Sequence, residues 1–229
     1  MSASQLQSSR ELATLHGIKV LVYGGAGVGK TKLVATAPSP VLISAESGLL
    51  SLREFDIPVW PVQSFSDLYA AYNWVTQSAD AKQFQTICLD SISEIGEVCL
   101  SEAKKRNKDP RQAYGELIDS MLLLIKGFRD LPNKHVYVSA KMEHYKDEVT
   151  GVVKNQPSMP GQQLGPALPY IFDEVFHMGI AKDDKGADYR YLRTQPDFQY
   201  EAKDRSGSLA AFEQPDLNYI FSKIIGAVT

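Results

Sequence analysis

The chain has 229 residues, of which 44% are apolar and 22% are charged, and its formal net charge is −3. These values are ordinary for a globular protein and leave room for a substantial core. They exclude an overall basic character, so a nucleic-acid partner would have to be bound by local basic patches. No apolar run approaches the length of a membrane span, and the N-terminal residues lack an apolar signal region.

The cysteines and histidines show no metal-binding pattern. Cys88 and Cys99 lack the paired spacing of zinc ligands, and two cysteines are compatible with a reducing compartment. We therefore expect a cytoplasmic protein that does not bind membranes. The four histidines have no ligand spacing either, and we interpret them as structural: His16, His135, His144 and His177.

Residues 1–16 are polar with scattered leucines, and they predict an N-terminal arm that is either disordered or a short helix. An apolar, β-branched run over 18–22 follows and predicts a buried strand. Since no internal repeat or linker divides the rest of the chain, we expect residues 17–229 to form a single domain.

Directly after this strand comes a glycine-rich stretch, residues 23–31, that fits G-x-x-x-x-G-K-[ST] and leads into helical turns over 32–36. The strand–loop–helix order predicts a phosphate-binding loop rather than a simple glycine-rich turn. The backbone N–H groups of such a loop point at an anion, and the helix N-terminus adds partial positive charge. Lys30 would reach the β- and γ-phosphates, and the Thr31 hydroxyl would bind Mg²⁺. The sequence thus predicts ATP and Mg²⁺ as cofactors, bound by Gly24, Gly25, Ala26, Gly27, Val28, Gly29, Lys30, Thr31 and Lys32.

Strands and helices alternate after the loop. Strands are predicted over 41–44, 56–62, 86–90 and 134–140, the second of them at a sheet edge because it contains prolines. Helices are predicted from Ser66 and over 92–104 and 113–129. This alternation is typical of an α/β fold in which helices cover both faces of a parallel sheet.

The pattern changes after residue 140. Residues 141–165 form a polar stretch with glycine and proline, in which a small hairpin is expected around 146–153. Two late strands are predicted over 173–181 and 190–194, and a terminal helix over 216–225.

Two acidic residues follow predicted strands. Asp90 closes an apolar strand and is typical of the carboxylate that orients Mg²⁺, although a helix N-cap would have the same place in the sequence. Glu46 follows the strand over 41–44, and the carboxyl ends of parallel strands line one crevice. We therefore expect Glu46 near Lys30 and Asp90, where it could deprotonate water. The alternatives are an exposed loop glutamate at 46 and Glu94 as the base.

The runs Leu42-Ile43-Ser44-Ala45-Glu46 and Ile87-Cys88-Leu89-Asp90-Ser91 resemble those of RecA-type recombinase cores, and the order of elements agrees over about 18–225. The chain is most similar to small phage-encoded RecA-like ATPases of single-strand annealing and recombination. The resemblance implies a three-layer RecA-like P-loop NTPase, with a mainly parallel central sheet extended by late antiparallel strands. It also implies that DNA or oligomerisation stimulates ATP hydrolysis, and that the protein is located in the cytoplasm of a bacterial host. The implied partners are single-stranded DNA and, as a further candidate, a single-strand-binding protein.

Two loops correspond to the DNA-binding loops of that family. The first contains five basic residues that could neutralise DNA phosphates, although a solvated helix end explains them equally well: Lys104, Lys105, Arg106, Lys108 and Arg111. The second covers about 142–165, where Lys146, Lys154 and 161–165 could meet DNA or simply form a mobile surface loop. Just before it, Ser139 and Ala140 stand where the family often has an amide that senses the γ-phosphate. Ser139 or Lys141 would take that role here.

The run Lys203-Asp204-Arg205-Ser206-Gly207 resembles the K-x-R-x-G element of RadA-like and DnaB-like relatives. In those proteins the lysine and arginine reach across a subunit interface to the γ-phosphate of the neighbour's ATP, where cations stabilise developing charge. The resemblance therefore implies a homo-oligomer, a ring or a filament, with ATP at subunit interfaces. An ordinary surface turn is the alternative for Lys203 and Arg205.

Two other functions use the same phosphate loop. A small-molecule phosphotransferase usually closes an arginine-rich lid over the phosphates, and no such lid is evident in the sequence. A nucleotide-binding switch would recruit partners and hardly hydrolyse ATP. ATP hydrolysis measured with and without single-stranded DNA separates these possibilities.

Overall fold

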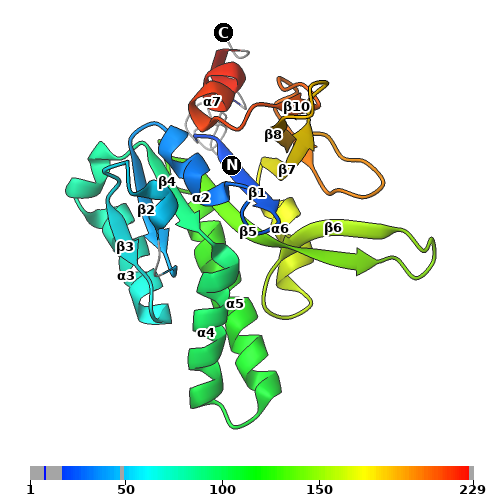
Figure 1. Ribbon diagram of the computed structural model, residues 1–229. Coiled ribbons are helices and arrows are strands. Elements are labelled where there is room, and N and C mark those ends of the chain that lie inside the picture. Colours follow the sequence, from blue (N-terminus) through cyan, green and yellow to red (C-terminus); the bar gives the residue numbers. More distant parts are fainter. Residues whose placement is uncertain (1–7, 9–16, 47–48, 227–229) are drawn as a thin grey trace.

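The structure is a computed structural model that describes residues 8, 17–46 and 49–226. The predicted N-terminal arm lies, apart from residue 8, outside these described residues, and so does His16. The described residues form a ten-stranded sheet whose main path runs β10-β8-β7-β1-β5-β4-β2-β3, with β6 paired to β5 and β9 paired to β7 (Figure 1).

Six adjacent strands of this path are parallel, which confirms the predicted sheet type. They are β1 (Lys19–Gly24), β2 (Pro40–Ser44), β3 (Val59–Pro61), β4 (Thr86–Asp90), β5 (His135–Lys146) and β7 (Glu174–Lys182). The proline-containing β3 lies at the edge, as predicted. The antiparallel strands are β6 (Val153–Ser158), β8 (Asp188–Arg193), β9 (Lys203–Asp204) and β10 (Phe212–Glu213).

Helices cover both faces of the sheet, so the predicted three-layer α/β architecture is confirmed. One face packs against α3 (Phe65–Gln77), α4 (Ile92–Arg106), α5 (Pro110–Arg129) and α6 (Leu164–Ile171). The other packs against α2 (Lys30–Leu33), its continuation as the 3₁₀ turn η2 (Val34–Thr36), and α7 (Leu217–Gly226).

The sequence of β1 shows how the two cores arise. Leu21 and Tyr23 belong to the core beneath α3–α6, whereas Val20 and Val22 belong to the core beneath α2 and α7. Successive side chains of a strand point to opposite faces, so a strand covered on both sides has to be continuously apolar. For this reason, the apolar run that precedes the phosphate loop could be recognised from the sequence as a buried strand.

The predicted basic loop over 104–111 is wrong in its secondary structure. Residues 104–106 form the last turn of α4, and α5 begins at Pro110, three residues earlier than predicted. Asp109 caps α5 by accepting a hydrogen bond from the Arg111 N–H, and proline is well suited to the first helical position because it lacks an N–H. The connection between the helices is therefore a tight turn over 107–109.

The predicted loop over 142–165 is also largely structured. β5 continues to Lys146 and forms with β6 a hairpin that projects from the sheet (Figure 1), longer than the small hairpin predicted around 146–153. After the hairpin, α6 was missed because Pro166 and Pro169 made a helix improbable on local grounds. The short β9 and β10 were missed as well, since two residues carry no recognisable pattern.

The cysteines and the described histidines have structural surroundings. Cys88 and Cys99 are free and buried. The His135 ring stacks on Phe221 with centroids 4.4 Å apart, and the His177 ring packs 4.2 Å from that of Tyr200. Within the described part of the chain, no helix is long and apolar enough to cross a membrane.

Candidate active site

The phosphate loop has the backbone geometry that its glycines allow. Gly27 and Gly29 have φ angles of 75° and 111°, in the left-handed region that side chains rarely tolerate. The Lys30 ammonium donates hydrogen bonds to the Gly24 and Gly25 carbonyls, each at 2.8 Å. Burial lowers the Lys30 pKa, and the nearby Asp90 and Glu46 carboxylates oppose this effect. The loop thus holds a partly desolvated cation whose neighbours on the sheet are acidic.

Serine hydroxyls join the ends of β2 and β4 to each other and to β5 behind this loop. Ser44, at the end of β2, donates to the backbone carbonyl of Asp90 at 2.7 Å and accepts from the Glu46 N–H at 3.0 Å. The Ser139 hydroxyl in β5 donates to the Asp90 side chain through Oδ1. These bonds hold Asp90 between β2 and β5 and keep the backbone of Glu46 close to it.

A pocket of about 570 Å³ lies over these strand ends. The structure brings Lys30, Thr31, Glu46 and Asp90 together in its wall, as the strand order led us to expect. Residues not singled out beforehand complete the wall, notably Ser51, Ser91 and Met142. The volume falls in the range of small-molecule sites. The individual roles of these residues stay predictions.

The donor set suits a magnesium ion that also binds phosphate oxygens and water. Asp90 is 1% exposed, and its Oδ2 atom has no hydrogen-bond partner within the described structure. Such a buried, unpaired carboxylate oxygen calls for a cation or water. Among the described residues, no cluster of three or more His, Cys, Asp or Glu side chains could hold a metal ion. Asp90 and the Thr31 hydroxyl therefore fit Mg²⁺, which keeps several waters, better than a metal held by protein ligands alone.

Of the two predicted bases, Glu46 lines the pocket and Glu94 does not. Glu94 instead pairs with Lys141, whose Nζ lies 2.5 Å from its Oε2. Burial raises the pKa of Glu46, and the negative charges of Asp90 and Glu94 raise it further. A carboxylate with a raised pKa is a stronger proton acceptor, which suits a general base.

Lys141 and Ser139, the two candidates for sensing the γ-phosphate, differ in their surroundings. Lys141 lines the pocket, and its side chain is about half exposed. Ser139 is fully buried and bonded to Asp90. The Lys141 side chain is therefore accessible from the pocket, whereas the Ser139 hydroxyl contacts only Asp90 among the two predicted acidic residues.

The structure does not bring Lys203 and Arg205 to this pocket. β9 pairs with Glu174 and Val175 at the start of β7, which is the sheet end opposite the phosphate loop. Lys203 donates to the Pro169 carbonyl at 2.6 Å, and Arg205 forms an ion pair with Asp173 at 2.7 Å. Neither side chain serves the pocket of its own chain in this arrangement.

The basic residues at the turn between α4 and α5 fall into two groups. Arg106 pairs with Glu116 at 2.5 Å and lies 3.8 Å from Glu102, and Lys104 lies over the Tyr114 ring. The other three are exposed at the tip of a helix pair that projects away from the sheet (Figure 1): Lys105, Lys108 and Arg111.

The residues predicted in the second DNA loop are likewise divided. Lys146 is exposed on the β5–β6 hairpin, and Lys154 is half-buried there. Gly165 is instead buried in α6, where a Cβ atom would lie 2.7 Å from the Pro157 carbonyl oxygen. Gly165 therefore serves packing, whereas residues 161–163 of the same predicted segment are exposed.

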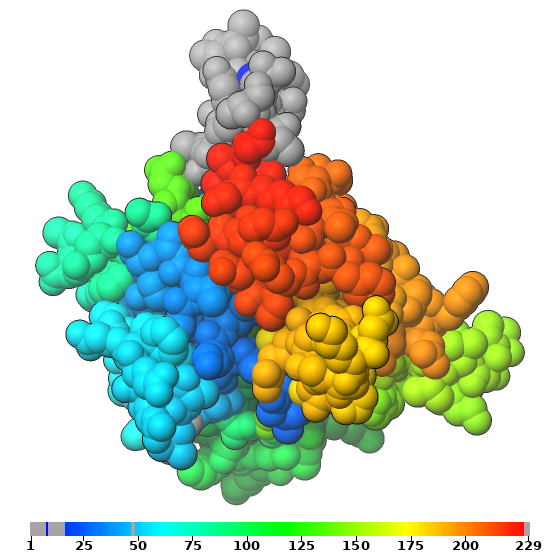
Figure 2. All heavy atoms as spheres, turned by 45° about the horizontal axis from the view of Figure 1, so that its top comes forward, coloured from blue at the N-terminus to red at the C-terminus, as the bar shows by residue number. Residues whose placement is uncertain are grey.

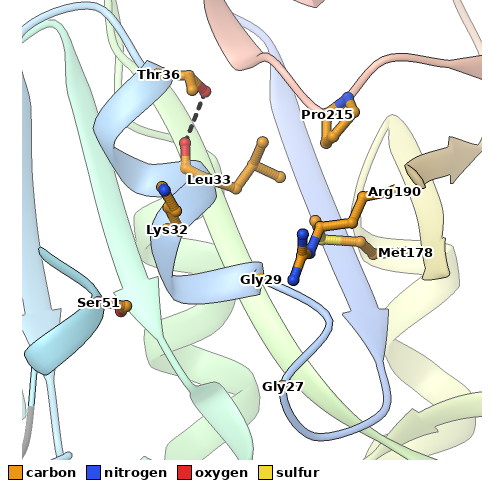
Figure 3. A pocket seen from close by; sticks show the side chains of 9 residues that line it. All are labelled: Gly27, Gly29, Lys32, Leu33, Thr36, Ser51, Met178, Arg190 and Pro215. Carbon is orange, nitrogen blue, oxygen red and sulfur yellow. Dashed lines mark hydrogen bonds between the residues drawn. The ribbon is translucent and has the colours of Figure 1, made fainter. Parts of the chain in front are cut away.

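A second hollow adjoins the phosphate loop on its other side. Its wall combines loop glycines and α2 with Met178 on β7, Arg190 on β8 and Pro215 before α7 (Figure 3). In Figure 2 the blue segment that contains the loop lies between the cyan segment after β2 and the yellow β7–β8 region. Met178, Arg190 and Pro215 were not predicted from the sequence, because no motif links residues this late in the chain to the phosphate loop.

The surroundings of Glu46 yield a testable pKa. We expect Glu94→Gln to lower the pKa of the Glu46 carboxyl, because it removes a neighbouring negative charge and frees Lys141. A ¹³C NMR titration of the Glu46 carboxyl, assigned with Glu46→Gln, measures this shift. Glu97→Gln on the exposed side of α4 is the matched control and should leave the pKa unchanged. An identical Glu46 pKa in wild type and Glu94→Gln would contradict the electrostatic coupling.

Comparison with known proteins places the chain in a family. The family described as AAA domain matches residues 16–206. Among solved structures, a KaiC-like protein from the hyperthermophilic archaeon Pyrococcus horikoshii OT3 is 16% identical, with a TM-score of 0.43 over 77% of this chain and 78% of the other. A prototypical ATPase from the type III secretion system of pathogenic bacteria is 14% identical, with a TM-score of 0.47 over 74% of this chain.

The match to the secretion ATPase covers 55% of that protein's length. Neither structural likeness bears on activity or partners, because the identities are 16% and 14% and the TM-scores are 0.43 and 0.47. A comparison with curated proteins gives no match.

The family match extends over most of the chain and includes the phosphate loop that ends in Lys30 and Thr31. The same segment contains both acidic strand ends of the pocket. The chain therefore belongs to the AAA-domain family and is a P-loop ATPase.

Proposed function

We propose that this protein hydrolyses ATP with Glu46 as the general base, works as a homo-oligomer, and binds single-stranded DNA to promote annealing or recombination. The observation that carries the proposal is the meeting of Lys30, Glu46 and Asp90 in one pocket. A cation for the phosphates, a carboxylate suited to Mg²⁺ and a second carboxylate with a raised pKa are the groups that ATP hydrolysis requires.

In the proposed reaction, the N–H groups of the phosphate loop and the Lys30 ammonium hold the β- and γ-phosphates. Glu46 accepts a proton from a water molecule as the water oxygen bonds to the γ-phosphorus, and the bond to the β–γ bridging oxygen breaks to release ADP and phosphate. Bound Mg²⁺ would supply charge neutralisation on the phosphates. Asp90 would orient the metal ion and would take no part in the proton transfer.

Lys141 is the proposed contact to the γ-phosphate from within the same chain. It lines the pocket, and its ion pair with Glu94 is partly exposed, so that exchanging the carboxylate for phosphate costs little. The same strand continues directly into the β5–β6 hairpin. When Lys141 exchanges Glu94 for a phosphate, the change therefore takes place where the β5–β6 hairpin leaves the sheet.

The proposal of an oligomer rests on the place of Lys203 and Arg205. Both lie at the sheet end opposite the phosphate loop, where they could face the pocket of an adjacent copy. Arg205 is exposed apart from its ion pair with Asp173, so its guanidinium can accept a new anionic partner. In this arrangement one copy supplies the cations that another copy's site lacks.

The proposal of DNA binding rests on the exposed tip of the α4–α5 pair. Lys105, Lys108 and Arg111 project there without a carboxylate partner among the ion pairs of the described residues. Cations of this kind bind phosphates irrespective of base sequence. Lys146 on the β5–β6 hairpin would add a second contact.

Replacing the proposed base tests the hydrolytic step. We expect Glu46→Gln to bind ATP as tightly as wild type or more tightly, but to hydrolyse it about 10²- to 10⁴-fold more slowly, because general-base catalysis contributes on that order. Steady-state phosphate release and ATP affinity are the measurements, made with and without single-stranded DNA. Glu97→Gln, on the exposed side of α4, is the control and should be as active as wild type. Undiminished turnover in Glu46→Gln removes Glu46 from the mechanism, and phosphate transfer to a nucleoside would favour a phosphotransferase.

Mixing variants tests the shared site. The ATPase rate of Arg205→Ala alone should fall about 10³-fold or more, as expected when an arginine finger is removed. Adding an equal amount of Glu46→Gln should restore measurable activity, because mixed interfaces pair an intact Glu46 with an intact Arg205. Asp173→Asn breaks the same ion pair but keeps Arg205, and it should remain active. Full activity of Arg205→Ala at high protein concentration would refute the shared site.

Charge reversal tests the DNA contact. The double variant Lys105→Glu/Lys108→Glu should weaken binding of a single-stranded oligonucleotide. It should also lower the salt dependence, by about 0.7 in slope for each DNA phosphate that the protein no longer neutralises. Fluorescence anisotropy at a series of salt concentrations measures both effects. Lys126→Glu, near the other end of α5, is the control and should bind as wild type does. Equal affinities for all three proteins would exclude the α4–α5 tip as a DNA contact.

A further inference from the structure

The hollow beside the phosphate loop has a volume of about 400 Å³ and continues the phosphate pocket. The two spaces share Gly27, Gly29, Lys32 and Ser51 in their walls. Figure 3 shows Arg190, Met178 and Pro215 on one side of the hollow, and Lys32 and Ser51 on the other. A triphosphate held in the loop would therefore extend its nucleoside toward this hollow.

Arg190 has an unusual place in the wall. It comes from β8, in the antiparallel extension of the sheet, and its Nε–H donates to the Val28 carbonyl of the phosphate loop at 2.8 Å. A Cβ atom at Gly29 would lie 3.3 Å from Arg190 Nε and 3.2 Å from Met178 Cε. The guanidinium thus rests directly on the loop backbone, and a glycine at 29 is what allows this approach.

Nothing in the described structure neutralises this cation. No ion pair of the described residues includes Arg190, and none of the described side chains that line the hollow is acidic. Hydrogen bonds already engage the Thr36 hydroxyl, which donates to the Leu33 carbonyl at 2.7 Å and accepts from the Leu217 N–H at 2.8 Å. On the side opposite Lys32 and Ser51, the wall therefore consists of a planar cation and apolar surface, from Arg190, Met178 and Pro215.

We propose that Arg190 is a binding and positioning residue of the ATPase, bracing the phosphate loop through Val28 while its guanidinium forms the wall on which the purine of the nucleotide lies. A planar guanidinium stacks well on an aromatic ring, and Met178 and Pro215 supply the adjoining apolar surface. This inference rests on the proposed binding of ATP in the adjacent pocket. Through Arg190, the antiparallel extension of the sheet would contribute to the affinity for the nucleotide.

The test compares ATP with inorganic tripolyphosphate, which has the phosphates but no base. Binding of each is measured by calorimetry with Mg²⁺ for wild type, Arg190→Ala, Arg190→Lys and the control Lys185→Ala in the exposed β7–β8 turn. We expect Arg190→Ala to weaken ATP binding about tenfold, in line with a cation–π contact, and tripolyphosphate binding no more than about twofold. Arg190→Lys should recover tripolyphosphate binding but not the full ATP affinity, because an ammonium has no planar face. Lys185→Ala should match wild type.

Equal losses for ATP and tripolyphosphate in Arg190→Ala would overturn the purine wall, since the residue would then act on the loop alone. Unchanged ATP binding in Arg190→Ala would overturn the inference altogether. If wild type bound tripolyphosphate but not ATP, the purine wall would fail while the phosphate site stood. If wild type bound neither, the proposed function itself would fall, and this inference with it.

Discussion

Two serine hydroxyls join the carboxyl ends of β2 and β4 to each other and to β5, and the pocket depends on these contacts. Ser44 links the backbone of Asp90 to that of Glu46, and Ser139 bonds to the Asp90 side chain. Hydrogen bonds in such a buried place are stronger than in water, and an unmade one is costly. The bonds therefore hold Asp90 and the backbone of Glu46 close to each other.

Electrostatics then gives the two carboxylates different properties. Asp90 is buried at a strand end with one oxygen unpaired, which suits a cation, whereas Glu46 is exposed enough to meet water. Burial and the charges of Asp90 and Glu94 raise the Glu46 pKa, while Lys30 and Lys141 oppose them. Neighbouring carboxyl groups held in different environments are a recurrent way to divide acid–base roles.

The parts added to the parallel sheet extend outward from this pocket. The β5–β6 hairpin continues the strand that carries Ser139 and Lys141, and its Asn155 carbonyl accepts a hydrogen bond from the Tyr23 hydroxyl of β1 at 2.9 Å. Both strands that support the site are thus connected to the same projecting arm. The antiparallel β8 returns to the phosphate loop through Arg190. A nucleotide in the pocket would therefore contact, directly or through one residue, both the β5–β6 hairpin and the antiparallel extension of the sheet.

The phosphate loop, the parallel sheet and the convergence of Glu46, Asp90 and Lys30 could be predicted from the amino-acid sequence. These features follow from local patterns and from the rule that parallel strands end at one edge. Partners that lie far apart along the chain, such as Lys141 with Glu94 and Arg190 with Val28, became evident only in the folded protein. The tertiary structure also decided that residues 104–111 are mostly helical and that the β5–β6 arm is a paired hairpin. The secondary structure of exposed segments cannot be recognised from apolar periodicity, because these segments do not bury one face. Contacts with the rest of the fold give them their helices and strands instead.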